Sequence, residues 1–73
     1  MELKWTEGFT IRVSAEKGTA SISANREGLL SLAEQIKALA CEKEGSHIHY
    51  DAYNSLEEGS AALIIEKTGG VAS

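Results

Sequence analysis

The strongest constraint on the fold is an alternation of apolar and polar residues with a period of two near the start of the chain. Six apolar residues occupy odd positions there: Leu3, Trp5, Phe9, Ile11, Val13 and Ala15. Because successive side chains of a β-strand point to opposite faces, this spacing predicts a strand with one buried face. Gly8 interrupts the pattern, so we expect one long strand bent at Gly8, or a strand broken there by a three-residue loop.

The residues that follow predict a β-hairpin. Closing the chain across residues 16–18 pairs apolar residues with one another: Ala15 with Ala20, Val13 with Ile22, and Ile11 with Ala24. Lys17-Gly18 is not a preferred sequence for a two-residue turn, and a four-residue loop built on a type I turn keeps the same register. The register is therefore predicted, while the turn type stays open.

A change to a period of three and four residues marks one amphipathic helix. Asn25 is a suitable N-cap, and Gly45 is the expected C-terminal stop. The expected apolar stripe between them comprises Leu29, Leu32, Ala33, Ile36, Leu39 and Ala40. Gly28 costs a helix about 1 kcal/mol relative to alanine, which suggests either a close backbone approach or a frayed helix end.

Two more strands are expected in the last third of the chain. Residues 47–51 alternate again, and residues 61–67 contain an apolar run typical of a strand that is buried on both faces or central in a sheet. The loop between them, residues 52–60, is long for a hairpin and carries Glu57 and Glu58.

The order of these elements predicts an α+β fold with two layers and ββαββ topology. We expect a four-stranded, mainly antiparallel sheet with the amphipathic helix on one face. The elements form a single domain over residues 1–67, followed by a flexible tail over residues 68–73. The face of the sheet opposite the helix is polar, and it is either plain solvated surface or a recognition surface for a partner.

Charge and composition narrow the classes of function. Eleven acidic and seven basic residues give a net charge of −4 without a basic stripe, so nucleic acid is an unsuitable partner. The chain has no apolar run long enough for a signal peptide or a membrane span. Cys41 is the single cysteine and cannot form an internal disulfide. We therefore expect a cytoplasmic protein, and the acidic balance suits a basic protein partner.

His47, His49 and Asp51 have the side chains of a metal site, but their spacing argues against one. On an extended strand His47 and Asp51 are about 13 Å apart, whereas each ligand of one zinc ion lies about 2 Å from it. The three residues therefore cannot share an ion. The two histidines can still form half of a metal or small-molecule site that other elements complete. The sequence shows no nucleophile motif, and we predict neither catalysis nor a cofactor.

Three segments carry a resemblance to a known family. Residues 23–33 (SANREGLLSLA), 47–51 (HIHYD) and 56–66 (LEEGSAALIIE) resemble immunity protein family 32, small bacterial proteins associated with polymorphic toxin systems. The resemblance covers about residues 22–67. Tyr50 departs from it, because an aliphatic residue is expected at this position.

The resemblance implies a cytoplasmic protein that binds and blocks a cognate toxin domain, with no catalysis and no cofactor. It points to six candidate recognition residues: His47, His49, Asp51, Glu57, Glu58 and Ser60. To these we add Tyr53, because its place in the long loop can present an aromatic ring to a partner. Two alternatives stay open: a metal- or ligand-binding domain that uses His47 and His49, and a homodimer built on the strand face that exposes Leu63 and Ile65, or Ile64.

Overall fold

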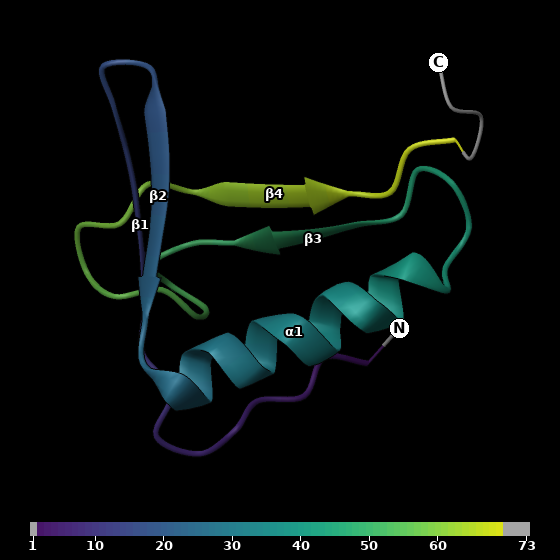
Figure 1. Cartoon of the computed structure of the whole chain (residues 1–73), viewed down its shortest axis with the longest axis horizontal. Coiled ribbons are helices and arrows are strands. Elements are labelled where there is room, and N and C mark those ends of the chain that lie inside the picture. Colours follow the sequence, from purple (N-terminus) through teal and green to yellow (C-terminus); the bar gives the residue numbers. More distant parts are fainter. Residues whose placement is uncertain (1, 70–73) are drawn as a thin grey trace.

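A computed structural model describes residues 2–69, which form one helix and four strands. The elements are β1 (Ile11–Glu16), β2 (Thr19–Ala24), α1 (Arg26–Ala40), β3 (His47–Tyr50) and β4 (Leu63–Glu66). This order confirms the α+β class and the ββαββ sequence of elements. Strands β3 and β4 run along α1, and the hairpin of β1 and β2 stands at the N-terminal end of the helix (Figure 1). Of the predicted tail, residues 70–73 lie outside the described residues.

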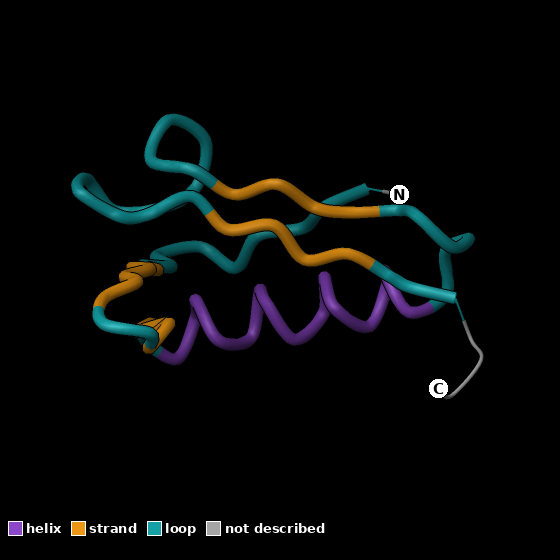
Figure 2. The backbone as a smooth tube through the Cα atoms, turned by 90° about the horizontal axis from the view of Figure 1, so that it is seen from above, coloured by secondary structure: helices purple, strands orange, loops and turns teal. Residues whose placement is uncertain are grey.

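The strands form two antiparallel two-stranded sheets, β1–β2 and β3–β4, where a single four-stranded sheet was expected. Figure 2 shows β3 and β4 lengthwise while β1 and β2 are seen nearly end-on. The segment before β4 bridges the two sheets, since the amide of Glu57 donates to the carbonyl of Ile11 and that of Ala61 to Val13, each at 2.8 Å. Gly59, with φ +87°, lies between these two bonds in a turn that the amide of Ser60 closes by donating to the carbonyl of Glu57 at 3.1 Å, and this turn interrupts a continuous ladder.

The predicted hairpin register is confirmed at every pair. Ala15 lies opposite Ala20, Val13 opposite Ile22, and Ile11 opposite Ala24. The turn type, which the sequence left open, is a two-residue turn: Lys17 and Gly18 both have positive φ, 49° and 79°, between the paired residues Glu16 and Thr19. Positive φ at both central residues is the geometry that matches the twist of the flanking strands.

The expected strand over residues 3–9 is wrong, because this segment packs on the helix without joining a sheet. The amide of Thr6 donates to Ser31 Oγ at 2.8 Å, and Gln35 Nε2 donates to the carbonyl of Lys4, also at 2.8 Å. Two buried polar side chains of α1 therefore form hydrogen bonds with backbone groups that would have paired with another strand in a sheet. The chain then turns at Gly8, whose φ is +86°.

The helix begins as predicted, but its buried face is rotated from the predicted stripe and shares only Leu32 and Leu39 with it. Asn25 caps it, since Oδ1 accepts from the amide of Gly28 at 2.8 Å. The residues that α1 buries are Gly28, Ser31, Leu32, Gln35 and Leu39. Of the predicted stripe, Leu29 is 54% exposed and Ile36 is 47% exposed. The helix ends at Ala40, before Gly45, and Lys67 Nζ donates to the carbonyl of Ala40 at 2.8 Å.

Tyr50 lies at the centre of the core and links three parts of the chain. Its side chain is fully buried, and its hydroxyl donates to Gln35 Oε1 at 2.7 Å. Trp5 packs edge-on against the Tyr50 ring, with 6.2 Å between ring centroids. Burial raises the pKa of Tyr50 above its ordinary value of 10.0. The core around it contains Ile11, Val13, Leu32, Leu39, Ile48 and Leu56.

Replacing Tyr50 with phenylalanine tests this link. At neutral pH we expect Tyr50→Phe to lower the free energy of unfolding by about 1–3 kcal/mol, because the buried Gln35 Oε1 loses its donor. The raised pKa in the folded state means that the neutral hydroxyl stabilises the fold fully below pH 10 and that this contribution is lost as the pH rises through the folded pKa. Urea unfolding at neutral and alkaline pH measures both effects. Tyr53→Phe, at an exposed tyrosine, is the control. An unchanged stability of Tyr50→Phe at both pH values would contradict the role of the hydroxyl.

Gly28 permits the close approach of α1 to β1. A Cβ at this position would collide with the carbonyl oxygen of Thr10 and lie 3.0 Å from both Ala24 Cβ and Ile11 Cγ1. We therefore expect Gly28→Ala to destabilise the protein by about 1–3 kcal/mol, even though alanine is the better helix former. Thermal unfolding measures the change, and Lys37→Ala on the exposed face of α1 is the matched control. A stabilised Gly28→Ala variant would contradict the packing argument.

Candidate functional site

A surface hollow lies between the turn that follows β3 and the segment that precedes β4. Its volume is about 640 Å³, and its walls are formed by Asp51, Ala52, Tyr53, Glu58, Gly59, Ser60 and Ala62. Four of the seven predicted recognition residues, Asp51, Tyr53, Glu58 and Ser60, therefore lie together. We take this hollow as the candidate site, and refer to it below as the loop hollow.

One wall of the loop hollow is a turn that its own side chains hold in shape. Asp51 Oδ1 accepts from the amides of Tyr53 at 2.9 Å and Asn54 at 3.0 Å. Asn54 in turn accepts from the amide of Asp51 at 3.1 Å and donates to the carbonyl of His49 at 3.3 Å. This Asx turn leaves the Tyr53 side chain 99% exposed. The ring is thus presented to solvent from a fixed backbone.

The other wall is held against β1. Ser60 Oγ accepts from the amide of Val13 at 3.2 Å, and Arg12 donates from a guanidinium nitrogen to the carbonyl of Glu58 at 3.1 Å. Between the two walls Leu56 is buried and fixes the loop to the core. Ser60 therefore has a structural contact as well as a place at the hollow, and the acidic side chain of Glu58 is exposed.

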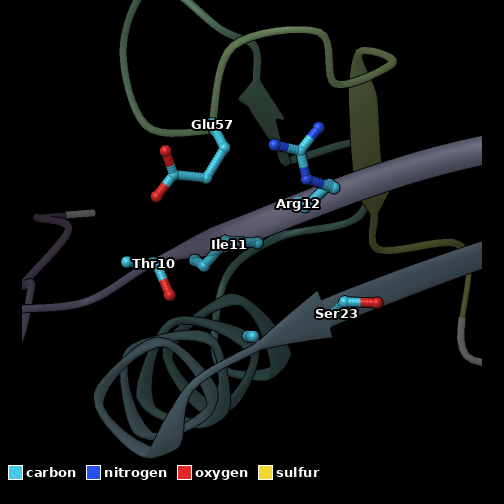
Figure 3. Close-up of a pocket in the computed structure, with 6 residues that line it drawn as sticks. Thr10, Ile11, Arg12, Ser23 and Glu57 are labelled. Carbon is cyan, nitrogen blue, oxygen red and sulfur yellow. The ribbon is translucent and has the colours of Figure 1, made fainter.

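Glu57 and Glu58 point to different parts of the surface. Glu58 lines the loop hollow, whereas Glu57 is half-buried and lines a second hollow of about 420 Å³ with Thr10, Arg12 and Ser23. Figure 3 shows the side chains of Glu57 and Arg12 on the same side of β1, above this second hollow. The two carboxylates therefore do not form one acidic cluster.

His47 and His49 lie apart from the loop hollow, on the outer face of the β3–β4 sheet. Both are exposed, and the register sets His47 opposite Glu66 and His49 opposite Ile64. Among residues 2–69, no three His, Cys, Asp or Glu side chains are grouped closely enough to hold a metal ion. Within the same range, no helix is both long and apolar enough to cross a membrane. The predicted site is therefore divided among the loop hollow, the second hollow at Glu57 and this strand face.

Two contributors to the site were absent from the predicted set. Asn54 closes the Asx turn, and the sequence signal for it was available, because Asp and Asn within one short loop are typical turn residues. Arg12 reaches Glu58 from a strand 46 positions earlier in the chain. No local pattern in the sequence indicates a contact over such a separation.

The family model described as immunity protein 32 matches residues 19–68, which is more than half of the chain. This range contains β2, α1, β3, β4 and the whole of the loop hollow, and it confirms the resemblance seen in the sequence. The strand β1, which holds one wall of the hollow, lies outside it. No curated protein and no solved structure matches the chain.

Removing the acceptor at Asp51 tests whether the turn is held by its own side chains. We expect Asp51→Ala to lower the free energy of unfolding by about 1–2 kcal/mol, because the amides of Tyr53 and Asn54 both lose an acceptor. Amide hydrogen exchange at residues 53 and 54 should accelerate in this variant. Asp51→Asn, which keeps an acceptor oxygen at the same position, should retain most of the protection. Equal protection in Asp51→Ala and the unmodified protein would overturn the assignment of the Asx turn.

Proposed function

Because this chain belongs to the immunity protein 32 family, we propose that it binds and neutralises a cognate toxin domain through the surface around the loop hollow. A role in toxin immunity is the role of the family; the contact surface and the mode of neutralisation are our proposal. The observation that carries it is Tyr53, which is 99% exposed on a turn fixed by two hydrogen bonds to Asp51.

A fixed, exposed tyrosine is well suited to anchor a protein interface. Tyrosine is enriched among the residues that dominate binding energy, and it offers a large contact area at a low cost in side-chain entropy. Since the backbone of the turn is already ordered, binding does not have to order it. The hollow beside the ring gives a partner side chain a place to insert. These properties favour a protein partner over a small ligand.

The charge of the surface indicates a basic partner. Asp51 and Glu58 lie on opposite walls of the hollow, and the chain has a net charge of −4. Arg12 bonds to the backbone of Glu58, and in the described part of the chain no ion pair involves the Glu58 carboxylate. This carboxylate is available to a lysine or arginine of the toxin, and complementary charge accelerates association.

We further propose that neutralisation occurs in the cytoplasm by occupation of the toxin surface, without catalysis and without a cofactor. The single cysteine and the acidic surface support this proposal. In this scheme the immunity protein needs only affinity and correct placement. The protection that it gives should then rise with the fraction of toxin that it has bound.

Two substitutions at the loop hollow test the assignment. We expect Tyr53→Ala to weaken binding of the purified toxin domain about tenfold or more, because it removes the central aromatic contact. We expect Glu58→Lys to slow association and to reduce its dependence on salt, because it reverses the charge that attracts a basic partner. Binding to surface-immobilised toxin domain measures the association and dissociation rates. Survival of cells that co-express the toxin measures protection.

Matched controls come from the exposed face of α1. Leu30→Ala removes an apolar side chain that is 42% exposed, and Glu34→Lys reverses a charge on an exposed position. Both should leave binding within about twofold of the unmodified protein. If the double variant Tyr53→Ala with Glu58→Lys folds and still protects cells fully, the loop hollow is not the toxin-binding surface.

A further inference from the structure

Strand β4 has a free edge that its composition does not protect. In the described part of the chain, β4 pairs with β3 alone. The amide of Lys67 donates to the carbonyl of Ser46 at 2.9 Å, so the alternation of an antiparallel ladder directs the backbone of Leu63 and Ile65 to β3. The backbone groups of Ile64 and Glu66 are then directed to the free edge.

Natural proteins shield such edges with charges, proline, bulges or a covering element. The centre of β4 is Leu-Ile-Ile, and its charged residues come only at the end, at Glu66 and Lys67. The Lys67 ammonium is turned toward the end of α1, where it donates to the carbonyls of Ala40 at 2.8 Å and Glu42 at 2.6 Å. It therefore does not shield the edge, and β4 is a template for a further strand.

The centre of this edge carries an exposed apolar side chain. Ile64, on the outer face of the β3–β4 sheet, is 60% exposed. Figure 1 shows β3 between α1 and β4, so the free edge of β4 is turned away from the helix. A strand added beside β4 would therefore lie next to Ile64.

We infer that the added strand is β4 of a second copy of this chain, paired antiparallel about a two-fold axis at Ile64. Ile64 then faces Ile64 of the second copy, and Leu63 faces Ile65 of the second copy. The two chains together would form one four-stranded sheet. This arrangement suits a domain of 73 residues, because an isolated two-stranded sheet is only marginally stable. A closed two-fold contact is also the commonest form of association between identical chains.

The positions of the charged residues favour this register over a shifted one. Each copy has a net charge of −4, so a stable pairing must keep carboxylates apart. With Ile64 on Ile64, Glu66 faces Ala62 of the second copy, and the two Glu66 residues are about 13 Å apart along the strands. Shifting the register by two residues would place Glu66 against Ile64. The register with Ile64 opposite Ile64 is therefore the favourable one, and it does not depend on the toxin.

Light scattering during gel filtration tests the dimer on the full chain without toxin. The expected mass is about twice the 7.8 kDa of one chain, and it should fall toward one chain on dilution. Ile64→Lys and Ile64→Glu should each be monomeric, because each places like charges directly opposite one another. Leu30→Lys, at a comparably exposed apolar residue of α1, should remain dimeric.

Mixing the two charged variants gives the sharpest result. Since position 64 faces its own copy, Ile64→Lys and Ile64→Glu should associate with each other into a heterodimer while neither associates with itself. Circular dichroism confirms that both variants are folded, as expected for a residue 60% exposed in one chain. A monomeric unmodified protein at high concentration, dimeric charged variants, or a mixture that stays monomeric would each overturn the inference.

Discussion

The hydrogen bond from the Tyr50 hydroxyl to Gln35 Oε1 joins β3 to α1, and the rest of the molecule is arranged around it. Gln35 also donates to the carbonyl of Lys4, so one buried amide holds the sheet and the N-terminal segment to the same helix. A core this small has little apolar area to spare, and a satisfied buried polar network fixes its geometry where packing alone would be less specific. In such a network, the removal of one partner leaves another buried polar group without its hydrogen bond.

The position of Tyr50 also determines where the loop hollow is built. Asp51, the next residue, begins the Asx turn that presents Tyr53, so the turn starts from the most firmly held point of β3. The far wall is fixed to β1 through Ser60 and Val13. The family match begins at residue 19, after β1, yet β1 supplies this support. The hollow also adjoins the proposed dimer contact, because Ala62 lines the hollow and faces Glu66 of the second copy.

The features that could be predicted from the sequence are those set by local periodicity. The hairpin register followed from pairing apolar residues, and the helix start followed from the capping preference of Asn25. The helix face was predicted only in part: Leu32 and Leu39 are buried as expected. The rest of the face differs because Ser31 and Gln35, both polar, are buried by bonds to residues 25 or more positions away. The same bonds explain why residues 3–9 do not form a strand. A period of two in apolar residues indicates an extended chain, but it does not identify the partner of that chain.

The predicted recognition residues are neighbours along the chain, but in the structure they lie on different faces of the molecule. Asp51, Tyr53, Glu58 and Ser60 come together because one loop returns on itself. His47 and His49 precede them directly but lie on the outer sheet face, since side chains alternate along β3. The adjacent glutamates diverge because the amide of Glu57 donates to the carbonyl of Ile11 in β1, whereas Glu58 lies in the turn that the amide of Ser60 closes.

The central claim, that the loop hollow contacts the toxin, is tested most directly by NMR of the isotope-labelled protein titrated with the purified cognate toxin domain. The account predicts that the amide signals of Tyr53, Glu58 and Ser60 shift or broaden first and most strongly, while those of the exposed α1 residues Leu30 and Glu34 keep their positions. Perturbations confined to α1 or to the histidine face of β3, with the signals of residues 51–60 unchanged at saturation, would contradict it.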